Sequence, residues 1–210
     1  MLRALLSLVA PPLCVSCGAH AGAGEPLCSP CRGELRWLGH DLASACGVEV
    51  WAPLAYEGPA RAMARALKFG RRQRLAETMA AQIAANAPER VFTAAALVPV
   101  PLHPARMRKR GFNQAELLAG ALAARTGLPV RDSLVRSGER GTQVGRGRVE
   151  RLASIAGTVG MRAGDEPPRR ALLVDDVVTT GATLATCAAA LRGAGAEAVT
   201  AVAYARTPGR

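Results

Sequence analysis

Two adjacent acids, Asp175 and Asp176, stand between an apolar run and a Thr-Thr-Gly-Ala-Thr turn, and this pattern restricts the fold of the chain most strongly. Residues 171–174 indicate a buried strand, residues 183–192 a helix and residues 198–204 a second strand. Strand, helix and strand in this order are typical of a parallel sheet covered by helices. The acids and the turn would then lie at the carboxyl edge of the sheet, where α/β proteins bind ligands.

The turn itself suits a phosphate group. Backbone N–H groups of residues 179–183 and the positive end of the following helix can surround a monophosphate, and Gly181 lets the backbone approach it. The acids would repel a phosphate, so they indicate hydroxyls or Mg²⁺ beside them, and a ribose 5-phosphate offers both hydroxyls and a phosphate. The alternative is a capped helix N-terminus without a ligand. We name Asp175 and Asp176 as candidate catalytic residues. The candidate ligand-binding residues of the turn are Val177, Val178, Thr179, Thr180, Gly181, Ala182 and Thr183.

Five of the six cysteines lie in the first 46 residues, which indicates a separate N-terminal region at residues 1–50 and a second domain at 51–210. Two Cys-x-x-Cys pairs have a spacing that lets four thiolates close on one structural Zn²⁺. The predicted metal ligands are Cys14, Cys17, Cys28 and Cys31. Unrelated buried or redox cysteines are the alternative. Cys46-Gly47 resembles the remnant of a third pair, with His20 or His40 as substitute ligands, although a lone histidine is more often a surface or packing residue.

The formal net charge is +11, and only Lys68 and Lys109 among the 27 cations are lysines. Arginine grips phosphate in a bidentate fork, so the excess favours phosphate ligands, with a compositional bias of the whole genome as the alternative. A helix is predicted from Gly58-Pro59 to Gly70. Its basic face would consist of Arg61, Arg65, Lys68 and Arg72. The basic run at 106–110 could equally be a solvated surface.

Three further elements follow from local patterns. Residues 94–100 indicate a buried strand, and Asn113 with Glu116 forms a capping pair for a helix that ends at Gly127. Residues 137–148 indicate a mobile loop. The apolar run at the start of the chain is too short for an export signal, and no later run is long enough to cross a bilayer. We therefore expect a cytoplasmic protein without a membrane span.

Residues 171–183 match the phosphoribosyl pyrophosphate signature of type I phosphoribosyltransferases at every position. The segments 56–58, 67–70, 98–104 and 110–117 look like those of the ComF family of competence-associated proteins. The resemblance implies an α/β type I phosphoribosyltransferase fold behind a zinc ribbon, in a family linked to DNA uptake.

The resemblance also implies roles for residues outside the turn. The loop at 100–103, with Pro101, would hold the pyrophosphate of the ligand, with Arg106, Arg108 and Arg110 nearby. A flexible hood would include Thr142, Gln143 and Arg151, although Ser154 stands where the family usually has Asn.

Two functions remain open from the sequence. The first is a transferase that binds Mg²⁺ and phosphoribosyl pyrophosphate, with an acceptor that no residue identifies. The second is a non-catalytic module that binds single-stranded DNA or a partner, such as a helicase-like competence protein, through its basic face.

Overall fold

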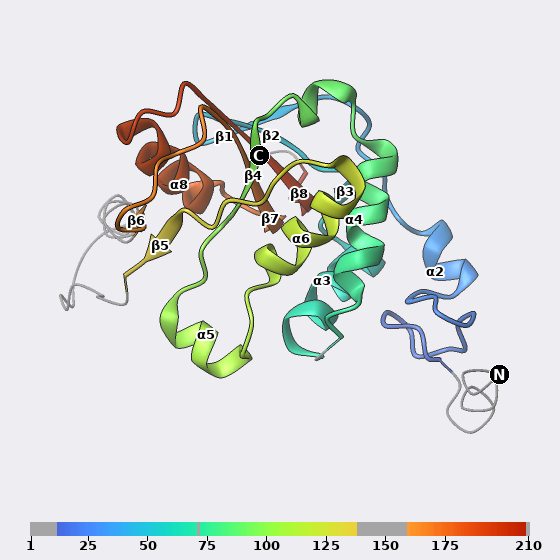
Figure 1. The fold of residues 1–210 in the computed structure, drawn as a ribbon. Helices are drawn as coiled ribbons and strands as arrows, with labels where there is room; N and C mark the ends of the chain where they lie inside the picture. Colours follow the sequence, from blue (N-terminus) through green and yellow to red (C-terminus); the bar gives the residue numbers. More distant parts are fainter. Residues whose placement is uncertain (1–11, 71, 138–158, 209–210) are drawn as a thin grey trace, which may run out of the picture.

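The computed structural model describes residues 12–70, 72–137 and 159–208, which form a largely parallel sheet covered by helices (Figure 1). The strand order is β1-β2-β8-β7-β4, and all neighbours are parallel except β1 and β2. Their bounds are β1 Ala43–Ala45, β2 Val48–Trp51, β8 Ala198–Arg206, β7 Arg170–Val178 and β4 Ala96–Pro99. A short strand, β3 Leu54–Ala55, also pairs with β8. The predicted strand–helix–strand unit is β7, α8 Ala182–Gly193 and β8, which confirms the α/β fold class.

Strand β7 is longer than its apolar residues indicate. It continues through Asp175, which lies opposite Ala203, and ends at Val178 opposite Arg206. Aspartate is depleted in strands, but here the nine-residue β8 supplies backbone partners for the whole segment. The two acids therefore lie within β7 itself, near its carboxyl end, instead of beyond the strand.

Alternate residues of β7 build two hydrophobic cores. Leu172 and Val174 belong to the core under α3 Gly58–Phe69, α4 Leu75–Asn86 and α6 Gln114–Thr126. Ala171 and Leu173 belong to the opposite core, under α8 and a separate antiparallel pair formed by β5 Leu134–Arg136 and β6 Val159–Met161. Strands buried on both faces are expected in a parallel sheet with helices on each side.

The helices near the carboxyl edge begin and end where the sequence predicts. Helix α3 has Pro59 in its first turn and Gly70 as its C-cap, and it buries Met63 and Leu67. Before α6, the side-chain oxygen Oδ1 of Asn113 accepts from the backbone N–H of Ala115, and its Nδ2 donates to Oε1 of Glu116. Gly127 ends α6 with a φ of 72°. Two shorter elements are η1 Glu89–Phe92 and α5 Pro104–Arg110.

The N-terminal region is joined to the sheet in two ways. Cys14, Cys31 and Leu35 pack in the same core as α3, beside the short helix α2 Ser29–Gly33. The hairpin β1–β2 within residues 43–51 pairs with β8 and so belongs to the central sheet. Among the described residues, no helix has the length and apolar character to span a membrane.

Candidate ligand-binding site and metal centre

A cavity of about 730 Å³ opens at the carboxyl edge of the sheet, within the size range of small-molecule sites. Its walls come from α3, the loop after β4, α5, the start of α6, β5, β7 and α8. The lining residues are Tyr56, Arg65, Lys68, Phe69, Val100, Pro101, Leu102, Arg106, Lys109, Arg110, Phe112, Gln114, Arg136, Asp175, Asp176, Val177 and Thr183. Segments distant in the sequence thus converge on the two acids.

Asp176 is held by groups from two helices and is only 1% exposed. One carboxylate oxygen, Oδ2, lies 2.7 Å from the Nζ of Lys68 on α3. The other, Oδ1, accepts a hydrogen bond of 3.2 Å from Nε2 of Gln114, the first residue of α6. A buried charge needs such partners, because desolvation without pairing is costly. The carboxylate of Asp176 is therefore fixed in orientation.

Asp175 has a different electrostatic environment from its neighbour. Its Oδ1 accepts from the backbone N–H of Asp176 at 2.8 Å. Loss of water around the carboxyl and the like charge of Asp176 raise the pKa of Asp175 to about 8, against the opposing effect of Lys68. Near neutral pH the side chain of the ligand-free protein is therefore mostly protonated. A ligand with hydroxyl groups, or a divalent cation, would therefore contact two different acids. The carboxylate of Asp176 is fixed in orientation, and the carboxyl of Asp175 carries a proton that a cation can displace.

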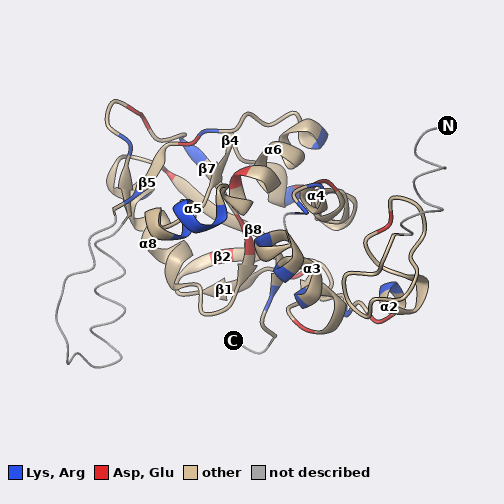
Figure 2. Ribbon diagram, turned by 90° about the horizontal axis from the view of Figure 1, so that it is seen from below, with Lys and Arg blue, Asp and Glu red and all other residues tan. Residues whose placement is uncertain are grey.

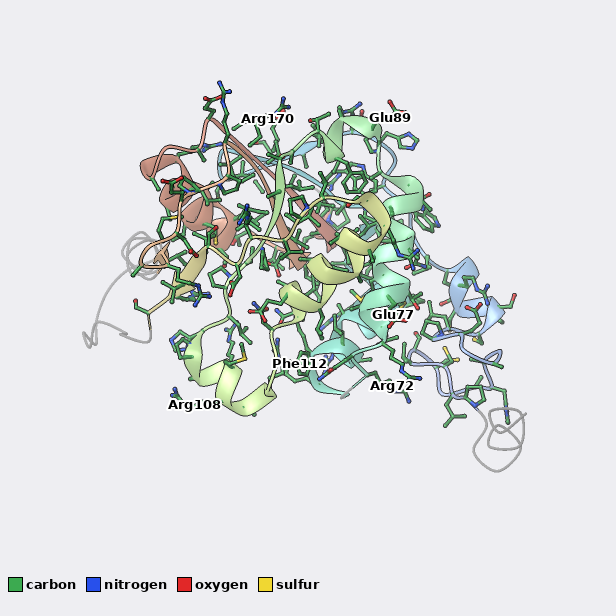
Figure 3. All side chains as sticks on the ribbon, in the orientation of Figure 1. Arg72, Glu77, Glu89, Arg108, Phe112 and Arg170 are labelled. Atoms are coloured by element: carbon green, nitrogen blue, oxygen red, sulfur yellow. The ribbon has the colours of Figure 1, made fainter. Side chains whose placement is uncertain are left out.

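Positive charge surrounds this acidic pair (Figure 2). The cationic residues of the cavity are Arg65, Lys68, Arg106, Lys109, Arg110 and Arg136, against two acids. Three of them lie on α5, whereas Arg108 of the same helix is exposed and lies outside the cavity lining, at the outer side of α5 in Figure 3. The guanidinium of Arg110 lies 5.3 Å from the centroid of the Phe69 ring and donates to Oε1 of Gln114.

The predicted basic face contributes to the cavity. The sequence places Lys68 with Arg61, Arg65 and Arg72 on one basic face. In the structure Lys68 points into the cavity and pairs with Asp176, because α3 ends at the site. Arg65 also lines the cavity, so α3 contributes two cations to the site.

The turn after β7 is packed against the hairpin β1–β2. Gly181 has a φ of 80°, and a Cβ there would lie 2.5 Å from the Cβ of Ala45 and 2.9 Å from its carbonyl oxygen. The thiol of Cys46 donates to the carbonyl oxygen of Thr180 at 3.0 Å. Cys46 and Gly47 both have positive φ, at 50° and 78°, as a two-residue type I′ hairpin requires. Cys46 therefore serves a hairpin that supports the turn and lies outside the four-cysteine cluster.

The turn residues divide between two places. Val177 and Thr183 line the main cavity, and Ala182 begins α8 after the Gly181 cap. Val178, Thr179 and Thr180 line a small pocket of about 90 Å³ next to the hairpin. The predicted hood residues Thr142, Gln143 and Arg151 lie outside the described residues.

We expect Gly181→Ala to destabilise the protein by about 2 kcal/mol or more. Alanine is disfavoured at positive φ by about 1–2 kcal/mol, and its methyl would also overlap Ala45. Gly120→Ala is the matched control, because Gly120 lies inside α6 with open space around it, and alanine there should stabilise by up to about 1 kcal/mol. Urea unfolding of both variants measures the difference. Equal stability of the two variants would contradict the close packing of turn and hairpin.

Several cavity residues were not predicted as site residues. They are Tyr56, Arg65, Lys68, Phe69, Lys109, Phe112, Gln114 and Arg136. Arg65 and Lys68 are three residues apart and so share one face of α3, and this spacing could have predicted both as site residues. Arg136 lies on a strand with no motif around it, and only the tertiary fold brings it to the acids.

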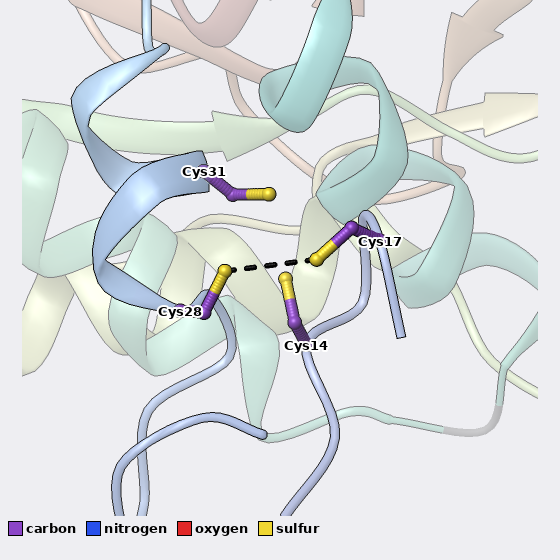
Figure 4. Close-up of side chains that lie close together, drawn as sticks. All are labelled: Cys14, Cys17, Cys28 and Cys31. Atoms are coloured by element: carbon purple, nitrogen blue, oxygen red, sulfur yellow. Dashed lines mark hydrogen bonds between the residues drawn. The ribbon is translucent and has the colours of Figure 1, made fainter. Parts of the chain in front are cut away.

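The four predicted zinc ligands meet at one point (Figure 4). The sulfur atoms of Cys14, Cys17, Cys28 and Cys31 all lie within 4.8 Å of one another, and those of Cys17 and Cys28 are 3.6 Å apart. The neighbouring Cys17 thiol and burial raise the pKa of Cys31 to about 12, so this thiol needs a cation beside it to ionise near neutral pH. The tight turn after the first pair uses Gly18, with a φ of 78°. This donor set fits a closed, structural Zn²⁺ site.

Comparisons with known proteins match the two regions separately. A family model described as a double zinc ribbon domain matches residues 5–64, and one described as a phosphoribosyl transferase domain matches residues 113–210. Competence protein F of Haemophilus influenzae is 36% identical over 50% of this chain and 47% of its own length. Competence protein ComFC of Streptococcus pneumoniae is 37% identical over 49% of this chain and 44% of its own length. The chain thus aligns with about half the length of these curated relatives.

Solved structures give a weaker likeness. A hypoxanthine phosphoribosyltransferase of Staphylococcus aureus has a TM-score of 0.38 at 16% identity, covering 66% of this chain and 64% of that one. An orotate phosphoribosyltransferase of Aeropyrum pernix has a TM-score of 0.37 at 18% identity, covering 82% and 75%. The family models and the curated relatives confirm the predicted combination of a zinc ribbon with a phosphoribosyltransferase-like domain.

Proposed function

We propose that this ComF-like chain binds a ribose 5-phosphate ligand, such as phosphoribosyl pyrophosphate, in the cavity at Asp175 and Asp176. The observation that carries the proposal is an acidic pair inside a cavity that six cationic residues also line. A ligand with hydroxyls at its centre and phosphates at both ends complements this arrangement of charge.

Each part of the cavity has a role in this proposal. The ribose hydroxyls would donate to Asp175 and Asp176, and the 5-phosphate would accept from the N–H groups of residues 179–183. Pro101 and its loop, with Arg106 and Arg110, would hold the pyrophosphate. The carboxylate oxygens also suit Mg²⁺, which would neutralise charge on the pyrophosphate oxygens. Arg151 stays a predicted contact.

If the chain is a transferase, the acceptor forms a bond to the anomeric carbon while the carbon–oxygen bond to pyrophosphate breaks. The electron pair leaves with the pyrophosphate, so negative charge grows beside α5. Arg106, Lys109 and Arg110 would stabilise that charge, and the fixed carboxylate of Asp176 would hold the ribose in place. The chain would act mainly through positioning and charge neutralisation.

Calorimetric titration with phosphoribosyl pyrophosphate and MgCl₂ tests this function. We expect saturable binding that Arg106→Ala weakens by about tenfold or more, because a charge-assisted hydrogen bond contributes about 1.5–3 kcal/mol. Arg108→Ala removes the same charge from the outer side of α5 and should change the affinity by less than twofold. Equal losses in both variants would indicate nonspecific charge attraction, and absence of binding to the zinc-loaded wild type would refute the proposal.

A second candidate function is nucleic-acid or partner binding. The printed names of the curated relatives associate them with competence, and we propose such an association for this chain. The exposed arginines of α3 and of the segment that follows it, Arg61, Arg65, Arg72 and Arg74, favour single-stranded DNA as the ligand. Helicase-like partners and a cytoplasmic location stay predictions. DNA binding that persists when Asp175 and Asp176 are replaced would place the two ligands at separate sites.

A further inference from the structure

Lys68 lies directly against the acidic pair. Its Nζ is 2.7 Å from Oδ2 of Asp176, and its side chain is 22% exposed, against 2% for the side chain of Asp176. Oδ2 is buried from solvent and accepts no hydrogen bond from the described residues, so the ammonium is its electrostatic partner. The other oxygen, Oδ1, accepts from Gln114. Both oxygens of Asp176 are therefore occupied before any ligand arrives.

The end of α3 holds the ammonium in this place. Lys68 belongs to the last turn of the helix, where the free backbone carbonyl groups favour a positive charge. The preceding residue, Leu67, is fully buried in the core, and the backbone N–H of Gly70 donates to the carbonyl oxygen of Ala66 at 2.8 Å. The position of Lys68 is therefore set by the helix as well as by Asp176.

This ion pair restricts where a divalent cation can bind. Mg²⁺ requires octahedral coordination and usually keeps several of its water molecules. Oδ2 of Asp176 offers neither contact with solvent nor an uncompensated charge, because the ammonium of Lys68 already neutralises it. A metal ion at this oxygen would have to displace the ammonium. Asp175, by contrast, is partly exposed and lines the cavity.

We propose that Lys68 takes the place of a divalent cation at Asp176 and binds the sugar phosphate through its remaining N–H groups. A lysine ammonium has three donors, so contact with one carboxylate oxygen leaves donors for the oxygen atoms of a ligand in the cavity that Lys68 lines. Mg²⁺ that arrives with a pyrophosphate is then held by the phosphate oxygens and Asp175. This inference rests on the proposed binding of a phosphorylated ribose, and it makes contact with the sugar phosphate independent of a metal.

The test uses ribose 5-phosphate, which carries the sugar and one phosphate without the pyrophosphate that itself attracts Mg²⁺. Calorimetry measures its affinity for the full-length, zinc-loaded protein in magnesium-free buffer and again with MgCl₂. No chelator is added, since it would remove the zinc. We expect the two affinities of the wild type to agree within about twofold, because Lys68 already neutralises Asp176. A wild type that needs Mg²⁺ for measurable binding of ribose 5-phosphate would overturn the proposal, and this comparison requires no variant.

Lys68→Met keeps an unbranched side chain of similar length and removes the ammonium. Without Mg²⁺ it should weaken binding of ribose 5-phosphate by about tenfold or more, because the ligand loses a charge-assisted contact and the charge of Asp176 stays unpaired. MgCl₂ should recover most of this loss, since a divalent cation can then take the place of the ammonium. Structural damage alone would not be reversed by a metal ion. A variant that binds as tightly as the wild type without Mg²⁺, or one that Mg²⁺ does not rescue, contradicts the proposal.

Arg61→Met is the matched control. It removes one positive charge from an exposed position of the same helix, outside the cavity lining, and should stay within about twofold of the wild type in both buffers. Equal losses in the two variants would indicate general charge attraction and refute the role of Lys68. If phosphoribosyl pyrophosphate binds but ribose 5-phosphate does not, the role of Lys68 is also refuted and the phosphate site stands. If neither ligand binds the wild type, the proposed function and this inference fall together.

Discussion

Loss of zinc is expected to unfold the segment around the four cysteines and to lower the stability of the whole protein. A structural zinc site supplies apparent binding free energy on the order of 10 kcal/mol to folding. Cys14, Cys28 and Cys31 also belong to the core that buries Met63 and Leu67 of α3, so the damage should reach the helix that carries Lys68. Thermal unfolding with and without a zinc chelator measures the effect.

Two cysteine variants make this expectation specific to the metal. Cys28→Ser should eliminate bound zinc, measured by elemental analysis, and should reproduce the destabilisation by chelator. Cys46→Ser should keep one zinc per chain, because Cys46 lies on the hairpin, where it contacts Thr180 of the turn after β7 and not the cluster. Two zinc ions per wild-type chain, or zinc loss in Cys46→Ser, would contradict the single four-cysteine site.

Replacement of both acids by asparagine, Asp175→Asn with Asp176→Asn, is expected to abolish measurable binding of Mg²⁺ and phosphoribosyl pyrophosphate. The variant replaces both carboxyl groups by neutral amides, which bind a cation more weakly and cannot accept charge-assisted hydrogen bonds from ribose hydroxyls, while the surrounding cations stay. A loss of at least a hundredfold follows from two charge-assisted contacts of about 1.5 kcal/mol or more each. Retained binding in the calorimeter would show that the ligand lies elsewhere.

The stability of the single variant Asp175→Asn shows whether a loss of ligand binding reflects the missing carboxyl group or a damaged fold. The pKa of Asp175 is raised from its ordinary value of 3.8 to about 8 in the folded protein, so over this range the folded state holds a proton that the unfolded state releases. Stability of the wild type should therefore fall as pH rises from about 4 to about 8. Asparagine has no proton to lose. The free energy of unfolding of Asp175→Asn should therefore rise relative to that of the wild type between about pH 4 and about pH 8, by an amount on the order of a few kcal/mol. An advantage that shrinks with rising pH would contradict the raised pKa.

Local patterns predicted much of this fold. Pro59 and Gly70 bounded α3, Asn113 and Gly127 bounded α6, and two cysteine pairs gave the whole metal cluster. These signals work because caps, turns and knuckles depend on neighbours in the sequence. The length of β7 was underestimated for the opposite reason, since its last residues are strand only through pairing with β8.

Only part of the site could be predicted from the sequence, because some of its residues form one continuous motif and others come from distant segments. The acids and the turn form one continuous motif, whereas Gln114, Arg136 and Phe112 reach the cavity from separate elements. Nothing local distinguishes an arginine that lines a cavity from one on the surface, as Arg106 and Arg108 on one helix illustrate. The role of Cys46 was likewise hidden, because a hairpin turn and a metal knuckle can both place glycine at a positive φ, as Gly47 and Gly18 show.

The position of the hairpin β1–β2 bears on how this protein can be divided. Val50 and Trp51 of β2 pair along one side of β8, and β3 pairs further along the same side. Strand β7 pairs with the other side of β8, so a fragment cut after residue 50 would keep that ladder. It would uncover part of the edge that β2 occupies, and an uncovered strand edge is a template for edge-to-edge aggregation. It would also remove Ala45 and Cys46 from behind the turn at Gly181. The N-terminal half of the hairpin is thus as much a part of the scaffold of the turn after β7 as helix α8, which follows that turn.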